Sequence, residues 1–141
     1  MMLAQHSLNL CQRQQLPLAL VFMDLDKFKQ INDNHGHVVG DQVLSFFANQ
    51  LKSTCREMDI CARIGGDEFV LLLMGSSKQD AERVMSRLKQ SMLRLNHEHT
   101  FGQNVSFSHG IIEVHPNGHH AIETLLALGD SIMYQHKRAN R

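Results

Sequence analysis

The chain has 141 residues, of which 43% are hydrophobic, and its 14 Lys and Arg residues balance its 14 Asp and Glu residues. That length and composition fit one globular domain and exclude a disordered chain. A formal net charge of zero argues against a broad electrostatic grip on a phosphate backbone, so we expect no nucleic-acid partner.

The pattern of apolar residues predicts a mixture of helices and strands. In chain order we expect a helix over residues 2–15, a buried central strand over 16–23, a short helix over 27–34, an amphipathic helix over 41–51, strands over 59–64 and 69–74, a helix over 78–95, a strand over 105–114 and a last helix over 121–138. This order predicts an α+β fold with a mainly antiparallel central sheet flanked by helices.

The cysteines and the apolar runs bear on the compartment. Cys11, Cys55 and Cys61 show no CxxC spacing, and an odd, sparse set of cysteines is typical of a reducing compartment. No apolar run approaches the roughly 18 residues of a membrane span. We therefore expect a cytoplasmic domain, which a larger parent protein could still attach to a membrane.

Two glycines, Gly65 and Gly66, separate the strands expected over 59–64 and 69–74. Such a pair predicts a two-residue hairpin turn with positive φ at both glycines, and without Cβ atoms the turn can admit a bulky anion. Asp67 and Glu68 follow at once, and because side chains alternate along a strand, we expect only one of them to face a given site squarely. An ordinary surface hairpin with solvated carboxylates is the alternative.

Asp24 ends the first buried strand, and Asp67 begins the strand after the glycines. If these strands are neighbours, both carboxylates reach the same edge of the sheet, where they would form a hard oxygen site suited to Mg²⁺. The alternative for Asp24 is a helix N-cap. Asp26 is the better cap candidate, because helix-like sequence begins directly after it, so we favour metal binding by Asp24.

Two further groups of polar residues are ambiguous by themselves. An amide and a carboxylate such as Asn32 and Asp41, with His37 between them, could read guanine, but ordinary turn chemistry explains these residue types equally simply. Lys137 and Arg141 could clamp phosphates, but cations are also favoured at a helix C-terminus.

Taken together, four segments resemble the GGDEF domain of diguanylate cyclases. The resemblance covers about residues 16–141 and depends on the segments 23–33, 36–41 (GHxxGD), 65–69 (the intact GGDEF signature) and 129–137. It implies a fold like that of nucleotidyl cyclases and polymerase palms. The family's opening DxLTGLxNR stretch and its last strand are missing, so we expect a linker helix over 1–15 and the domain over 16–141.

The resemblance implies an enzyme, a nucleotidyltransferase that condenses two GTP into cyclic di-3′,5′-GMP and releases two pyrophosphates. Its active site would be completed when two chains face each other as a homodimer, brought together by a sensor domain upstream in the parent protein. Two Mg²⁺ ions, or Mn²⁺ in their place, would be held by Asp24, the Leu25 carbonyl, Asp67 and Glu68. Asp67 would also sit where the attacking hydroxyl loses its proton, and Lys29 would stabilise charge developing on the phosphates.

The substrate-binding residues implied by the resemblance are Asn32, His37 and Asp41 at guanine, Gly65 and Gly66 beneath the phosphates, and Lys137 and Arg141 at the β and γ phosphates. A catalytically silent GGDEF-like module that binds GTP or cyclic di-GMP as a regulatory receptor is the alternative, supported by the missing opening motif alone.

Arg56 and Asp59 form an RxxD motif shortly before the signature, and Arg87 follows on the next helix. In the family this spacing resembles the site at which the product, cyclic di-GMP, inhibits the enzyme. The planar fork of arginine suits the phosphate and guanine edges of such a ligand. The alternative is an Arg–Asp pair on the surface, which would contribute little energy.

Overall fold

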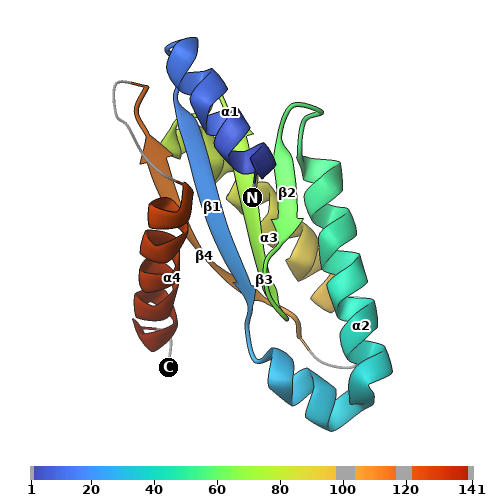
Figure 1. Ribbon diagram of the computed structural model, residues 1–141. Helices are drawn as coiled ribbons and strands as arrows, with labels where there is room; N and C mark the ends of the chain where they lie inside the picture. Colours follow the sequence, from blue (N-terminus) through green and yellow to red (C-terminus); the bar gives the residue numbers. More distant parts are fainter. Residues whose placement is uncertain (1, 98–103, 117–121, 140–141) are drawn as a thin grey trace.

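The computed structural model describes residues 2–97, 104–116 and 122–139 (Figure 1). The helices and strands follow one another as α1 (Met2–Arg13), β1 (Leu18–Leu25), α2 (Phe28–Thr54), β2 (Ile60–Arg63), β3 (Glu68–Met74), α3 (Lys78–His97), β4 (Phe107–Val114) and α4 (Ile122–Ala139). Among these described residues, no helix is both long enough and apolar enough to cross a membrane.

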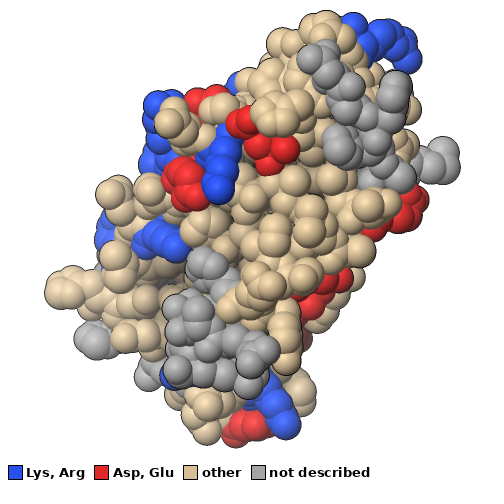
Figure 2. All heavy atoms as spheres, turned by 90° about the vertical axis from the view of Figure 1, so that its left-hand side faces the viewer, with Lys and Arg blue, Asp and Glu red and all other residues tan. Residues whose placement is uncertain are grey.

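The strands form a four-stranded sheet in the order β2-β3-β1-β4, with antiparallel pairing throughout. Helices α2 and α3 cover one face and α1 and α4 cover the other (Figure 1). The predicted α+β fold with a mainly antiparallel sheet is therefore confirmed. On the side that carries α4 and β4, basic and acidic side chains are interspersed around a broad uncharged area (Figure 2).

Strand β1 lies between β3 and β4 and contributes to both cores. Its alternate side chains point to opposite faces, so Val21 and Met23 join the core under α2 and α3, while Leu20 and Phe22 join the core under α1 and α4. Burial on both faces explains why the strand reads as a continuous apolar run. It also fixes the end of β1, and with it Asp24, firmly within the sheet.

The segment after β1 differs from its prediction in two ways. The expected break between two helices is present, because Gly36 has φ 86° and ψ 164° inside α2, but the helix resumes directly after this glycine and not at Asp41. Asp26 is not the helix cap: the N-cap is Lys27, with φ 55° and no side-chain hydrogen bond. The Asp26 carboxylate instead accepts hydrogen bonds from the hydroxyls of Ser106 (2.9 Å) and Ser108 (2.6 Å).

Helix α1 packs onto the sheet, with Leu8 and Cys11 buried in the core under α1 and α4. The expected division into a linker over residues 1–15 and a domain over 16–141 stays a prediction. The Pro-Asn-Gly sequence of residues 116–118 predicts a turn, but residues 117 and 118 lie outside the described part of the chain.

Candidate active site

The hairpin between β2 and β3 carries the glycines and two of the carboxylates. The predicted two-residue turn is wrong. Residues 64–67 form a four-residue loop, closed by the Ile64 N–H donating to the Glu68 carbonyl at 3.0 Å. Within the described part of the chain, positive φ is confined to Gln15, Lys27, Gly36 and Gly75, so Gly65 and Gly66 do not adopt the left-handed turn geometry.

Arg63, for which the sequence predicts no role, spans this loop. Its Nε donates to the carbonyls of Gly65 (3.0 Å) and Gly66 (3.1 Å), and its Nη2 donates to Gly66 at 2.7 Å. The signal in the sequence was an arginine directly before the loop at the end of a strand, but arginines at strand ends are common. The contact became evident only from the loop geometry.

Asp24, Asp67 and Glu68 gather at this end of the sheet. Asp24 lies opposite Glu68 in the register of β1 and β3, and each of the three offers a carboxylate oxygen within 4.8 Å of the others. Asp24 and Asp67 therefore meet at one sheet edge as predicted. The expectation that only one of Asp67 and Glu68 could face the site is wrong, because Asp67 lies in the loop, where strand alternation does not apply.

The donor set of this cluster fits a hard divalent cation. Three carboxylates are the ligands that Mg²⁺ and Mn²⁺ prefer, whereas the nitrogen and sulfur ligands typical of zinc are absent from it. Leu25, whose carbonyl the resemblance names as a further ligand, lies beside the cluster, since its N–H donates to the Asp67 carbonyl at 3.1 Å.

The cluster opens onto a cavity of about 190 Å³ between the hairpin and α4. Asp24 and Glu68 line its sheet side, and Asp130 and Tyr134 line its helix side. Lys137 belongs to the last turns of α4, but its side chain and the whole of Arg141 lie outside the described residues. The expected phosphate clamp stays a prediction.

A second hollow, of about 390 Å³, lies between α2 and the hairpin, and Asp41 lines it together with Arg63 and Phe69. Asn32 reaches the same region, because a Cβ on Gly40 would overlap the Asn32 side-chain amide. The residue before Asp41 must therefore be glycine for Asn32 to lie there. The two predicted guanine-reading residues thus come from opposite sides of the Gly36 break to neighbouring positions.

His37 and Lys29 lie on the two halves of α2. His37 is exposed and lies four residues before Asp41, on the same face of the second half. Lys29 is exposed on the first half, three residues before Asn32. Helical spacing therefore puts Lys29 on the face that carries Asn32, and His37 on the face that carries Asp41.

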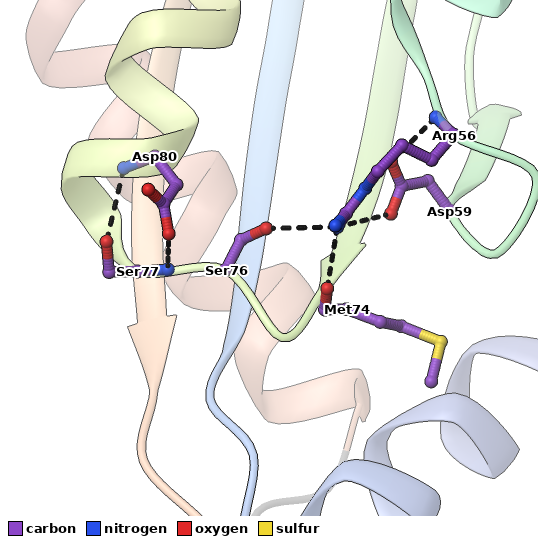
Figure 3. A network of polar contacts seen from close by, with 6 residues as sticks. All are labelled: Arg56, Asp59, Met74, Ser76, Ser77 and Asp80. Atoms are coloured by element: carbon purple, nitrogen blue, oxygen red, sulfur yellow. Dashed lines mark hydrogen bonds and ion pairs between the residues drawn. The ribbon is translucent and has the colours of Figure 1, made fainter.

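The RxxD residues form a hydrogen-bonded network at the far end of β3 (Figure 3). Arg56 Nη2 lies 3.2 Å from Asp59 Oδ1, and Arg56 Nε donates to Asp59 Oδ2 at 3.3 Å. The same guanidinium donates to the Met74 carbonyl (2.7 Å) and the Ser76 hydroxyl (3.2 Å). The Asp59 side chain is only 3% exposed, so the arginine shields a buried carboxylate.

Arg56, Asp59 and Arg87, predicted as one site, line one open cavity of about 830 Å³ between this network and α3. On its wall the N–H of Ser77 donates to Asp80, and the Asp80 N–H donates to the Ser77 hydroxyl (Figure 3). The Ser77 backbone N–H, followed by its hydroxyl, lowers the pKa of Asp80. This reciprocal cap fixes the start of α3, which carries Arg87.

The comparisons with known proteins agree with this architecture. The family model "Diguanylate cyclase, GGDEF domain" matches residues 2–141. Diguanylate cyclase DosC of Escherichia coli is 34% identical over 129 residues, which are 89% of this chain and 27% of that protein. The uncharacterized protein YhcK of Bacillus subtilis is 38% identical over 124 residues, which are 87% of this chain and 34% of that protein.

Among solved structures, the active GGEEF domain of a diguanylate cyclase from Vibrio cholerae superposes with a TM-score of 0.84 at 29% identity, covering 96% of this chain and 86% of that one. The chain spans about a third or less of the two curated relatives. With the signature intact and the family model matched over nearly the whole length, the chain belongs to the GGDEF domain family of diguanylate cyclases.

Proposed function

We propose that this chain condenses two GTP into cyclic di-3′,5′-GMP with release of two pyrophosphates. The observation that carries the proposal is the convergence of Asp24, Asp67 and Glu68 within 4.8 Å at the end of an intact GGDEF hairpin. Family membership supports the reaction class. The carboxylates supply what that class requires, which is neutralisation of phosphate charge and precise positioning.

Asp24, Asp67, Glu68 and the Leu25 carbonyl would hold Mg²⁺ or Mn²⁺. A bound cation supplies Lewis-acid stabilisation of the phosphates and makes the attacking 3′-hydroxyl more acidic. Asp67, at the loop end of the cluster, would receive the proton of that hydroxyl. The neighbouring cavity between the hairpin and α4 would leave room for phosphate groups, with Lys137, Arg141 and Lys29 as their cationic partners.

Guanine recognition would depend on Asp41 and Asn32, near the hollow between α2 and the hairpin. Asp41 can accept from the ring N–H and the exocyclic amine of guanine, while the Asn32 amide offers both donor and acceptor to the remaining edge. Adenine presents the opposite pattern of donor and acceptor at these positions. The pair therefore favours GTP over ATP, with His37 beside it on α2.

The reaction would need two chains. Within the described residues there is one carboxylate cluster of this kind, which suits one GTP per chain. Joining two GTP then requires that two such sites face each other as a homodimer. The curated relatives are about three times as long as the matched segment or longer, which supports a further domain in the parent protein that brings two copies together.

Product inhibition would act through Arg56, Asp59 and Arg87. Two arginines and a carboxylate around an open cavity of about 830 Å³ match the charges and hydrogen-bonding edges of a cyclic dinucleotide. Arg56 is already held in place by Met74 and Ser76, so little side-chain entropy remains to be lost on binding.

The decisive experiment is product analysis of concentrated protein with GTP and Mg²⁺. Wild type should form cyclic di-GMP, and Asp67→Asn should form none, while Glu123→Gln, which removes a carboxylate from the exposed start of α4, should match wild type. ATP in place of GTP should give no product. GTP binding without turnover at any protein concentration would instead favour the regulatory receptor.

A further inference from the structure

The loop that carries the signature is held through its carbonyl groups. The Gly65 and Gly66 carbonyls accept from the Arg63 guanidinium, at 3.0 Å and at 3.1 and 2.7 Å respectively. The next two accept from backbone groups: Asp67 from the N–H of Leu25 at 3.1 Å, and Glu68 from the N–H of Ile64 at 3.0 Å. Four successive carbonyls are therefore fixed, and Arg63 is the side chain that fixes the first two.

Packing does little to restrain this loop. A Cβ on Gly66 would meet nothing within 4 Å, and the nearest neighbour at Gly65 is the flexible Glu68 side chain. Glycine also has the largest backbone freedom of any residue. Without Arg63, the two peptides directly before Asp67 would lose the contacts that select one conformation.

Arg63 itself has a rigid base. Its backbone pairs with Phe69 in the β2–β3 register, and the Phe69 ring is buried 5.1 Å from that of Phe47. The guanidinium therefore reaches the loop from an ordered strand end. Its two nitrogen donors span two neighbouring carbonyls, which suits the planar fork of arginine better than the single ammonium of lysine.

The hydrogen bonds from Arg63 to the Gly65 and Gly66 carbonyls, here called the Arg63 clamp, also set the direction of two N–H groups. In a trans peptide the N–H points away from the carbonyl of the same unit, and the described residues contain no cis peptide. With the Gly65 and Gly66 carbonyls turned toward Arg63, the N–H groups of Gly66 and Asp67 point away from it. Successive backbone N–H groups of this kind make good donors to a phosphate oxygen.

We propose that Arg63 is a positioning residue of the active site. It holds loop 64–67 in the one conformation that keeps Asp67 and Glu68 beside Asp24 and that presents the Gly66 and Asp67 N–H groups to a substrate phosphate. This inference depends on the proposed function for the identity of the substrate. The part that concerns the metal site does not depend on turnover.

The clamp is expected to matter to the site and little to the fold. Arg63 is exposed, and exposed hydrogen bonds add little to global stability. Partners that orient metal ligands have larger local effects, and their loss typically costs about 10- to 100-fold in metal affinity or activity. Arg63→Ala should therefore bind metal about 10- to 100-fold more weakly while its thermal midpoint changes little.

The test is a titration of the protein with Mn²⁺ in the absence of nucleotide, followed by the electron paramagnetic resonance signal of the free ion. Arg63→Ala should show the loss, Arg63→Lys should recover part of it, and Arg94→Ala, which removes an exposed arginine at the far end of α3, should match wild type. Asp24→Asn provides the reference for a broken site.

Unchanged Mn²⁺ affinity in Arg63→Ala would overturn the inference, even if the chain proves to be an active cyclase. Absence of Mn²⁺ binding in wild type would overturn it together with the metal site. Wild-type binding that Arg63→Ala weakens, in a chain that makes no cyclic di-GMP, would sustain the clamp and contradict the proposed function. Where turnover is present, a raised Mg²⁺ requirement and a lowered kcat in Arg63→Ala further support the inference.

Discussion

The two ends of β3 differ in how their charged side chains are arranged. At its start, Glu68 lies opposite Asp24 and beside Asp67, so three carboxyl groups share a region less than 5 Å across. At its end, the Met74 carbonyl accepts a hydrogen bond from Arg56, which also neutralises the buried carboxylate of Asp59. The start of β3, here called the carboxylate end, brings like charges together. The end of β3, here called the arginine end, pairs unlike charges.

This difference indicates what each end requires from a ligand. Like charges directly opposite one another on neighbouring strands destabilise a sheet. A cation bound at the carboxylate end would therefore relieve this repulsion, as the proposed function requires. The arginine end is satisfied before any ligand arrives. It would form a preorganised pocket for the proposed ligand, whereas the carboxylate end would depend on the proposed metal.

The largest effect on folding should come from breaking the arginine end. Arg56→Ala removes the guanidinium donors from Asp59, whose side chain is 3% exposed, and we expect a loss of about 1–3 kcal/mol in the free energy of unfolding. The lower part of that range is favoured, because the backbone N–H of residue 56 still donates to Asp59 at 2.9 Å. Urea denaturation would measure the loss.

Arg83→Ala is the matched control for that change, since it removes an arginine from an exposed i,i+3 pair on the same cavity wall. It should leave the urea midpoint almost unchanged. Equal losses in the two variants would contradict the view that the arginine end contributes to stability through its buried carboxylate. Arg56→Ala should in addition abolish binding of cyclic di-GMP to the pocket.

A substitution at the carboxylate end should raise the free energy of unfolding, whereas Arg56→Ala lowers it. Glu68→Gln removes one of two like charges that face each other across β1 and β3, so the metal-free protein should gain about 0.2–1 kcal/mol in the free energy of unfolding. Glu57→Gln, in the exposed turn of the RxxD motif, serves as the control.

Mg²⁺ should make wild type more stable than Glu68→Gln, because a ligand that binds the folded state more tightly stabilises it more. Wild type, with all three carboxylates, should gain more from saturating Mg²⁺ than Glu68→Gln does. A variant that is less stable than wild type both with and without the metal would show that repulsion between these carboxyl groups does not govern this end of the sheet.

The comparison also shows what sequence can predict. The elements followed from apolar periodicity, and the meeting of Asp24 with Asp67 followed from two strands being neighbours. Both depend on regularities that repeat along the chain. The cap at Asp26 failed because its carboxylate is taken by Ser106 and Ser108, some 80 residues away in sequence. The residues around Asp26 in the sequence cannot predict a hydrogen-bond partner that lies so far along the chain.

The loop at residues 64–67 failed for a related reason. Glycines permit many conformations, and a side chain outside the pair, Arg63, selects one of them. The partner of His109 is likewise set by the fold. This histidine is largely buried in β4, and its Nε2 lies 3.6 Å from Glu82 Oε2 on α3, a pairing that only the packing of α3 on the sheet brings about.

The smallest effect at neutral pH concerns Cys55, which directly precedes Arg56 at the arginine end. Burial, and then the neighbouring Cys61, raise the pKa of Cys55 from its ordinary value of 9.0 to about 12. A raised pKa means that the folded state holds the proton more tightly than the unfolded state does. The stabilising contribution is therefore complete below pH 9 and is lost as the pH rises toward 12.

Cys55→Ala should accordingly match wild type in its pH dependence from pH 6 to 8, and should lose stability less steeply than wild type between pH 9 and 11. Urea midpoints across that range would measure the two slopes, with Cys11→Ala as a control for a thiol whose pKa is also raised by burial but which lies under α1. Parallel curves for wild type and Cys55→Ala would show that this thiol is as free to ionise in the folded chain as in the unfolded one.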